Sequence, residues 1–249
     1  MSQPLADHRR LRDYRDHYRV DAEAILDPES LPPNRRASEH RRFEALLRVL
    51  GPRPGERLLD MGCGSGWFAE QCRRKGAQVW AADIALRGVA GARARFPQVG
   101  CYQVADVYHL PFASGRFDAV VLSEVAEHLE DLAGAFAELA RLLRPGGRLL
   151  VSVPYRETIV EHLCIHCNRL TPANAHLHSF DEQSLAALLR AQGLAPRSLA
   201  LLNNKALELI GVPHLTRAFP YWVWRGLDRL GNAAVGRPAF LGMLAYRPS

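Results

Sequence analysis

The sequence predicts an α/β protein built on a doubly wound, mostly parallel β-sheet. Short apolar runs alternate with stretches of helical periodicity, which is the pattern of a parallel sheet with helices on both faces. A glycine-rich turn follows the first of these runs, and acidic residues end the next two. Because ligands of such sheets bind beyond the carboxyl ends of the strands, we expect the functional site there.

The composition suits one globular core with insertions. The chain has 249 residues, of which 48% are hydrophobic. We expect a cytoplasmic protein, because no apolar run reaches the roughly 20 residues that span a bilayer and the polar start is unlike a signal peptide. Five cysteines, one of them in the glycine turn, argue against a disulfide framework. We divide the chain into an N-terminal helical extension, 1–42, and a domain, 43–249, with insertions at 154–180 and 203–238.

The net charge of +6 does not predict a nucleic-acid partner. Residues 204–249 contain six Lys or Arg against two Asp or Glu, so most of the excess lies near the C-terminus. Lys75 and Lys205 are the only lysines. Genome base composition accounts for so many arginines as readily as phosphate recognition does.

The expected elements begin with helix-compatible segments in 1–33 and a helix over 35–50. The arginines of that helix, Arg35, Arg36, Arg41 and Arg42, are read first as a solvated face and second as partners of a ligand carboxylate. Further on, strands are expected at 57–61, 78–83, 100–105, 117–123 and 147–153, and helices at 66–75, 86–95 and 132–144.

The first strand ends at Asp60 and leads into the turn, whose glycines are Gly62, Gly64 and Gly66. Glycine lets the backbone turn sharply and approach a ligand closely. A dinucleotide fingerprint needs glycine at its sixth position, where this chain has Trp67. The turn therefore suits a nucleotide-type cofactor that lacks a pyrophosphate, and it disfavours an NAD-dependent oxidoreductase.

The second strand ends at Asp83, which lies 23 residues after Asp60. A carboxylate at this distance from a glycine turn can accept hydrogen bonds from both ribose hydroxyls. Asp83 can also cap a helix that begins near Ile84, and the two roles are compatible.

Three further motifs follow in order. The third strand ends at Asp106-Val107, the fourth leads into Glu124-Val125-Ala126-Glu127-His128, and a Pro145-Gly146-Gly147 turn precedes the fifth. Together with the glycine turn and Asp83, this set resembles the class I S-adenosylmethionine-dependent methyltransferases over roughly 43–200. The run after the fourth strand is similar to the small-molecule branch, which includes quinone-ring methyltransferases.

The resemblance implies a seven-stranded, Rossmann-like sheet with a sixth strand near 195–202 and an antiparallel final strand near 240–246. It makes 43–249 the methyltransferase domain and S-adenosylmethionine the cofactor. Asp60 would orient the amino-acid part of the cofactor, Asp106 would accept from the adenine amino group, and the backbone amide of Val107 would meet the ring. The other cofactor-binding residues that it implies are Gly62, Cys63, Gly64, Gly66, Ile84, Ser123 and Glu124.

The sulfonium of this cofactor already makes its methyl group electrophilic, so the protein has to align the acceptor and remove a proton where necessary. Histidine is the natural base near neutral pH. We assign this role to His128, just past the fourth strand, or to His176, in the possible lid after the fifth. Alternatively, His128 caps a helix and His176 binds zinc.

Cys164, Cys167, His176 and His178 have a spacing that can supply four tetrahedral zinc ligands. His162 and His166 are spare candidates. The alternative is a lid with unligated thiols, in which a histidine anchors the loop or faces the substrate.

The insertion 203–238 places aromatic residues beside arginines, namely Phe219, Tyr221, Trp222, Trp224, Arg217, Arg225 and Arg229. Packing onto the sheet is the first interpretation. The second is a peripheral contact with an anionic membrane, or a cover over a hydrophobic substrate.

The sequence thus predicts a methyltransferase that acts on a small-molecule acceptor, with hydrophobic and lipid-linked acceptors among the candidates. Whether oxygen, nitrogen or carbon is methylated stays open, and no oligomeric state is indicated. The alternative function is a non-catalytic S-adenosylmethionine-binding protein, stapled by zinc and recruited to a membrane or partner by 203–238.

Overall fold

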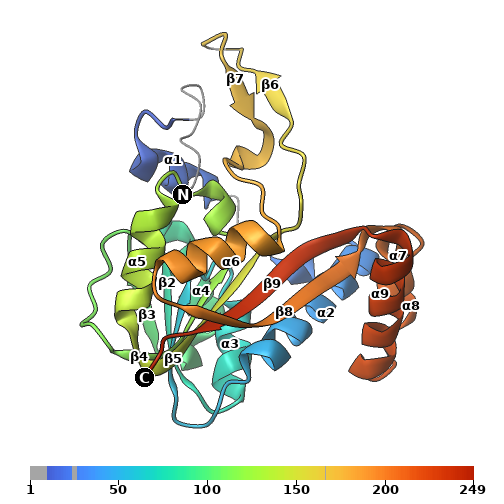
Figure 1. Cartoon of the computed structure of the whole chain (residues 1–249), viewed down its shortest axis with the longest axis horizontal. Helices are drawn as coiled ribbons and strands as arrows, with labels where there is room; N and C mark the ends of the chain where they lie inside the picture. Colours follow the sequence, from blue (N-terminus) through green and yellow to red (C-terminus); the bar gives the residue numbers. More distant parts are fainter. Residues whose placement is uncertain (1–9, 24–26, 166) are drawn as a thin grey trace.

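Seven strands form one sheet at the centre of the protein (Figure 1). A computed structural model describes residues 10–23, 27–165 and 167–249. The strand order is β3-β2-β1-β4-β5-β9-β8, and β6-β7 form a separate hairpin. The strands are β1 (Arg57–Met61), β2 (Gln78–Asp83), β3 (Cys101–Val104), β4 (Phe117–Ser123), β5 (Leu143–Pro154), β6 (Glu161–Leu163), β7 (Leu170–Pro172), β8 (Ala195–Asn204) and β9 (Pro238–Tyr246).

Strands β1 to β5 are parallel, whereas β9 runs antiparallel to both of its neighbours, β5 and β8. This confirms the predicted doubly wound sheet with an antiparallel final strand. The strand order reverses between β1 and β4. A ligand is therefore expected where these two strands end.

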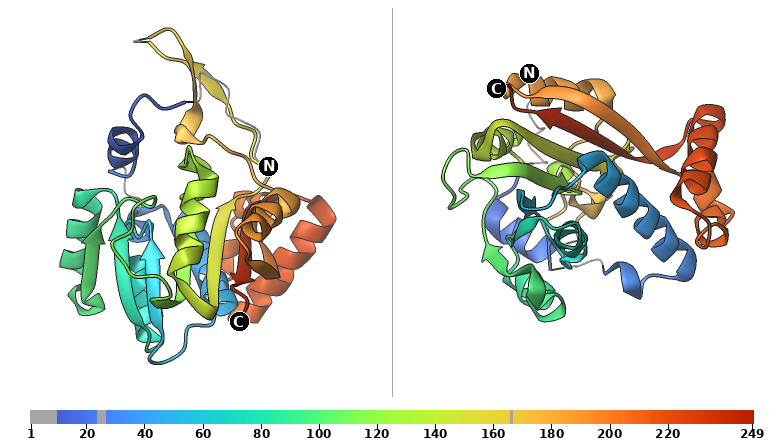
Figure 2. Two further views of the ribbon diagram at one scale, coloured as in Figure 1. Left: turned by 60° about the vertical axis from the view of Figure 1, so that its left-hand side comes forward. Right: turned by 90° about the horizontal axis from the view of Figure 1, so that it is seen from below.

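Helices cover both faces of the sheet (Figure 2). Buried side chains of α5 and α6 belong to the core on one face, and those of α2, α3 and α9 to the core on the other. The helices are α1 (Tyr14–Asp21), α2 (Pro33–Leu50), α3 (Trp67–Arg74), α4 (Leu86–Arg95), α5 (Leu132–Leu142), α6 (Glu182–Ala191), α7 (Lys205–Leu209), α8 (Val212–Leu215) and α9 (Tyr221–Val235).

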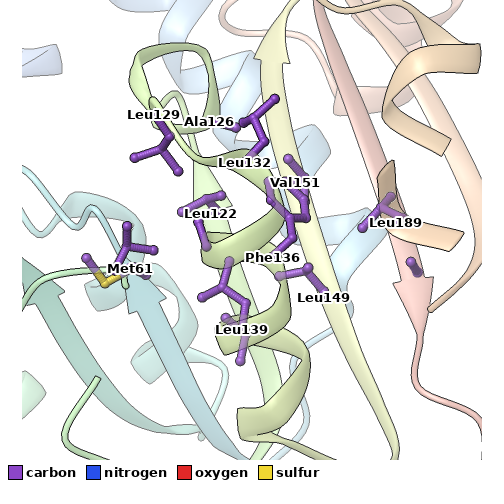
Figure 3. Packing of buried hydrophobic residues seen from close by; sticks show 14 of the residues in the cluster. Met61, Leu122, Ala126, Leu129, Leu132, Phe136, Leu139, Leu149, Val151 and Leu189 are labelled. Atoms are coloured by element: carbon purple, nitrogen blue, oxygen red, sulfur yellow. The ribbon is translucent and has the colours of Figure 1, made fainter. Parts of the chain in front are cut away.

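The packing of α5 on β4 and β5 shows how sequence periodicity produces the core (Figure 3). Leu132, Phe136 and Leu139 follow helical spacing, are buried, and lie beside Leu122 and Leu149 of the sheet. Asp131 precedes the helix, and its side chain accepts from the backbone amide of Gly134 at 2.9 Å. Asp131 therefore fixes the start of α5. The packing of α5 against the sheet holds β4 in position.

The insertion 154–180, for which no strand was expected, contains the hairpin β6-β7. The hairpin projects from the main body near α1 (Figure 1). Its apolar residues Leu163 and Leu170 are exposed. The hairpin therefore has no buried face, and its sequence lacks the alternation of apolar and polar residues that marks a half-buried strand.

Helix α2 crosses the proposed boundary between residues 42 and 43. Its first half is buried against the C-terminal insertion: Asn203 Nδ2 donates to the carbonyl oxygen of Ser38 at 2.9 Å, and Arg41 Nη2 donates to that of Thr216 at 2.7 Å. The described helices include none that is long and apolar enough to cross a membrane.

Candidate cofactor and acceptor site

The glycine turn joins β1 to α3 and has three left-handed glycines. Gly62, Gly64 and Gly66 have φ angles of +78°, +46° and +73°. A Cβ on Gly62 would lie 2.2 Å from Cγ2 of Val125, and one on Gly66 would lie 2.9 Å from Cβ of Ala92. A Cβ on Gly64 would meet no described atom within 4 Å. Packing therefore requires two of the glycines, and Gly64 borders open space.

Cys63 lies inside this turn and is buried. Burial raises the pKa of its thiol well above the usual range. The thiol is therefore protonated near neutral pH and is not a nucleophile. Cys63 therefore serves as a small, buried residue of the turn.

Asp60 and Asp83 are two buried carboxyl groups beside the turn. Oδ2 of Asp60 has no hydrogen-bond partner within the described part of the chain. Burial, together with the charge of Asp83, raises the pKa of Asp60 to about 7. Asp83 accepts from the backbone amides of Gly64 and Ala85, each at 3.0 Å. Two acidic groups at this turn favour a cationic ligand and oppose a pyrophosphate.

Helix α1 covers Asp106 at the end of β3. Tyr14 Oη and Arg15 Nε donate to Oδ2 of Asp106 at 2.9 Å and 3.1 Å, and the amide of Tyr108 donates to Oδ1 at 3.0 Å. Burial opposes ionisation of this carboxyl group, but these hydrogen bonds lower its pKa. Val107 is buried in the core. The adenine roles of Asp106 and Val107 stay predictions, and the sequence did not indicate that α1 contacts them.

A buried ion-pair network lies where β4 ends. Glu124 has a φ of +55°, and its Oε1 accepts from Ser152 Oγ at 2.9 Å. Arg42 Nη1 is 3.3 Å from the same oxygen, and Arg42 also binds Glu39 Oε2 at 2.7 Å. Ser123 Oγ accepts from Arg42 at 3.4 Å. Among the four arginines that the sequence singled out in α2, Arg42 reaches the strand end where Ser123 and Glu124 were predicted to meet the cofactor.

Glu127, His128 and His176 form a second cluster next to β4, the E127/H128/H176 cluster. The first two belong to the 3₁₀ turn Ala126–His128, and His176 follows the 3₁₀ turn Ala173–Ala175. The two imidazole rings have centroids 4.7 Å apart at an interplanar angle of 85°. Ligand atoms of the three side chains lie within 4.8 Å of one another. The structure thus brings together the two histidines predicted as candidate bases.

Each histidine of this cluster contacts a carboxylate. Asp21 Oδ2 lies 3.1 Å from Nδ1 of His128, and Glu157 Oε2 hydrogen-bonds to Nδ1 of His176. The amides of Leu177 and His178 donate to the carbonyl oxygen of Glu127, which fixes the segment after His176 over the strand end. Sequence reasoning gave no role to Asp21, Glu127 or Glu157. The adjacency of Glu127 to His128 was the one signal that could have found any of them.

The predicted four-ligand zinc set is not assembled. Cys164 and Cys167 lie at the turn between β6 and β7, whereas His178 Nε2 donates to the carbonyl oxygen of Leu129 at 2.8 Å. Over residues 10–23, 27–165 and 167–249, no group of three metal-ligating side chains includes either cysteine. His166, a spare candidate, lies outside the described residues. The sequence spacing suggested one zinc site, but the hairpin holds the two cysteines apart from His176 and His178.

The C-terminal insertion packs by one side of α9. Trp224 and Asp228 are buried, and Asp228 accepts from the amide of Asn204 at 2.8 Å and pairs with Arg225 at 2.7 Å. Trp222 is 73% exposed. The other apolar residues of the insertion that lie at the surface are Leu209, Ile210, Leu215, Phe219, Leu227, Leu230 and Val235.

The sheet, the glycine turn at its switch point and the acidic strand ends define the class: an α/β enzyme that holds a nucleotide-type cofactor against an acceptor site. A family model described as a methyltransferase domain matches residues 35–199. The chain therefore belongs to this family, and it is a class I, S-adenosylmethionine-dependent methyltransferase of the small-molecule branch.

Similar proteins agree with this assignment. The malonyl-[acyl-carrier protein] O-methyltransferase of Erwinia billingiae is 32% identical over 183 residues, 69% of this chain and 71% of that protein. The ubiquinone biosynthesis O-methyltransferase of Xanthomonas axonopodis pv. citri is 37% identical over 163 residues, 61% of this chain and 68% of that one. The demethylmenaquinone methyltransferase of Beutenbergia cavernae matches over 45% of its length.

The fold also matches solved structures. An S-adenosylmethionine-dependent methyltransferase from Mesorhizobium loti superposes with a TM-score of 0.61 at 23% identity, and the match covers 83% of this chain and 98% of that one. At this identity the likeness concerns the fold.

Proposed function

We propose that this enzyme transfers the methyl group of S-adenosylmethionine to a hydroxyl of a hydrophobic small molecule, and that His128 removes the hydroxyl proton. The observation that carries the proposal is the carboxylate beside each histidine of the E127/H128/H176 cluster: Asp21 beside His128 and Glu157 beside His176. A carboxylate next to Nδ1 orients the ring and stabilises its protonated form. His176, at the other side of the cluster, would be the alternative base.

The cofactor would lie along the strand ends of β1 to β4. The unpartnered oxygen of Asp60 suits the cationic amine of S-adenosylmethionine. Asp83 accepts hydrogen bonds from two backbone amides, and its remaining lone pairs would accept hydrogen bonds from the ribose hydroxyls. Asp106 and Val107 would hold the adenine ring. The remaining predicted contacts are Gly62, Cys63, Gly64, Gly66, Ile84, Ser123 and Glu124.

Two observations support the choice of acceptor. Two of the similar proteins are named O-methyltransferases, which favours an oxygen acceptor. The insertion 203–238 carries exposed apolar side chains near Arg217 and Arg229. We propose that it contacts an anionic membrane surface peripherally, where a lipid-linked acceptor would be met.

The test has two readouts on one variant. Metabolite extracts are screened for a cofactor-dependent mass gain of one methyl group, and the acceptor found is then used with His128→Asn. We expect methyl transfer to fall at least about a hundredfold, as for loss of a general base, with S-adenosylmethionine affinity by calorimetry unchanged. Near-normal turnover in this variant would contradict the role of His128, and His176→Asn is the matched comparison.

The cofactor assignment has its own test. Asp83→Ala should weaken S-adenosylmethionine binding at least about tenfold, because hydrogen bonds to a charged group contribute on the order of 1.5–3 kcal/mol. Asp83→Asn, which keeps one acceptor oxygen, should lose less. Unchanged affinity in a folded Asp83→Ala variant would defeat the ribose assignment. A non-catalytic binding protein would bind the cofactor equally well but yield no methylated product in the extract screen.

A further inference from the structure

The E127/H128/H176 cluster has the donor set of a transition-metal site. One carboxylate and two imidazoles, with ligand atoms within 4.8 Å of one another, converge beside the end of β4. Proteins use two histidines and one carboxylate to hold Zn²⁺ and related first-row ions with coordination positions left open. We propose that these three side chains bind one divalent first-row ion of the zinc type.

The buried carboxyl group of Glu127 is the second, independent observation. Its side chain is 1% exposed, and its Oε2 has no hydrogen-bond partner in the part of the chain that the structure describes. A buried polar atom without a partner is costly. A cation within the cluster would give this oxygen a partner, and it would stabilise the ionised form of the Glu127 carboxyl group.

A carboxylate lies behind each histidine, and the one behind His176 is hydrogen-bonded to its ring. Asp21 lies 3.1 Å from Nδ1 of His128, and Glu157 hydrogen-bonds to Nδ1 of His176. For His176, a carboxylate that accepts from Nδ1 leaves the Nε2 lone pair unprotonated, and such outer partners are a regular feature of histidine metal ligands. Nδ1 of His128 lies near Asp21 but has no hydrogen-bond partner in the described part of the chain. Nε2 of His128 faces Glu127, at 4.0 Å from its Oε1.

The surrounding charge also favours a cation. The acidic groups Asp21, Glu124 and Glu157 lie around the cluster, and Arg42 is the cation that pairs with Glu124. The cysteines of the hairpin do not belong to this site. A metal here therefore differs in place and in donor atoms from the four-ligand set that the sequence suggested.

This inference does not rest on methyl transfer. Coordination and proton removal both use the Nε2 lone pairs, so they exclude one another at a given moment. The test therefore measures ion binding by the full-length protein without acceptor or S-adenosylmethionine. Failure of the metal site would leave the role of His128 as a base untouched, and the reverse also holds.

The experiment titrates chelator-treated protein with Zn²⁺ by calorimetry and with Co²⁺ by visible absorption. We expect one equivalent of either ion. The isosteric variant Glu127→Gln and the variant His176→Gln should each weaken binding at least about tenfold, with circular dichroism unchanged. The double variant Cys164→Ser/Cys167→Ser is the matched control and should bind as the wild type does.

Three results would each overturn the inference. The first is binding of less than a tenth of an equivalent of both ions, and the second is equal binding by wild type and Glu127→Gln. The third is a thiolate-to-cobalt charge-transfer band that disappears in the cysteine variant, since that band would place the ion at the hairpin.

Discussion

At the scale of single residues, the site is marked by buried carboxyl groups whose oxygens lack partners. Asp60 and Glu127 each have such an oxygen, and each lies where a parallel strand of the sheet ends. Buried polar atoms without a hydrogen-bond partner are rare, and such groups are concentrated at ligand-binding and catalytic sites. Asp60 was predicted because it directly precedes the glycine turn. Glu127 was missed because burial, which the sequence does not show, is what makes it unusual.

The raised pKa of Asp60 predicts pH-linked cofactor binding. Its pKa is about 7 because of burial and then the charge of Asp83. A cationic amine binds the ionised form, so affinity rises as pH increases through 7 and binding releases a proton. Between pH 6 and pH 8 the ionised fraction, and with it S-adenosylmethionine affinity, should increase about tenfold.

Calorimetry in buffers of different ionisation enthalpy measures this proton release. The variant Asp60→Asn, which cannot ionise, should bind more weakly and with an affinity that does not change over the same pH range. A pH-independent affinity in the wild type would show that the amine of the cofactor does not meet Asp60.

The same shift affects stability in the absence of ligand, with the opposite sign. The folded pKa of Asp60 lies above its usual value, so its protonated form stabilises the fold. This contribution is complete below about pH 4 and is lost as pH rises to 7. Saturating S-adenosylmethionine should reduce that loss.

At the scale of elements, the glycine turn owes its shape to contacts with two different elements. Gly62 approaches Val125 beyond β4, and Gly66 approaches Ala92 of α4. The spacing of the glycines predicted the turn. It did not predict which neighbours exclude a side chain, because those neighbours lie far away in the sequence.

Two alanine variants separate packing from ligand access. Gly62→Ala combines a positive φ with a Cβ 2.2 Å from Val125, so we expect a loss of roughly 2–5 kcal/mol in the free energy of unfolding. Gly64→Ala has the positive φ but no such contact, so it should lose only about 1–2 kcal/mol. Its affinity for S-adenosylmethionine should nevertheless fall at least about tenfold, because its Cβ enters the open space assigned to the cofactor.

Urea unfolding and calorimetry measure both effects. Val125→Ala in the Gly62→Ala background should restore part of the stability, since it removes the contacting methyl groups. Equal stabilities of Gly62→Ala and Gly64→Ala would contradict the packing account.

Helix α9 separates a packing side from an exposed apolar side. Trp222 and Leu230 are exposed, whereas Trp224 and Asp228 are buried. Trp222→Ser/Leu230→Ser should lower partitioning onto vesicles of phosphatidylglycerol and phosphatidylcholine at least about tenfold, because each buried apolar side chain contributes on the order of 1.5–3 kcal/mol. The thermal midpoint should not change.

Arg229→Ala is the companion variant. It should weaken partitioning about fivefold on the anionic vesicles and leave it unchanged on neutral ones, since a basic residue near an anionic surface contributes about 1 kcal/mol. Failure of the wild type to sediment with either vesicle would remove the membrane proposal and leave α9 as a packing element.

At the scale of the whole molecule, helix α2 and the insertion 203–238, which are far apart in the sequence, pack together beside the sheet. Helix α2 begins at Pro33, and its first half binds the C-terminal insertion through Ser38 and Arg41. The predicted boundary at 42/43 coincides with the start of the family resemblance, at about residue 43. The contacts that Ser38 and Arg41 make on the N-terminal side of this boundary are hydrogen bonds. Hydrogen bonds of this kind produce no apolar periodicity that a sequence could show.

Truncation tests this arrangement. A chain of residues 43–249 cuts α2 and leaves the partners of Arg41 and Arg42 unsatisfied, so we expect it to lose at least about 3 kcal/mol, or about 10 °C in thermal midpoint. A chain of residues 32–249 keeps the whole helix and should unfold in one cooperative step at higher temperature. Equal midpoints would mean that the first half of α2 adds nothing to the fold.

The sequence by itself determined the alternating elements, the sheet type and the line of strand ends that carries Asp60, Asp83 and Asp106. These depend on short-range periodicity and on glycine conformation, which are written locally in the chain. The tertiary structure alone decided that His128 and His176 meet, that Asp21 and Glu157 lie beside them, and that the cysteines stay apart from His176 and His178. Such pairings depend on loop paths across many residues, and side-chain spacing along the chain does not encode them.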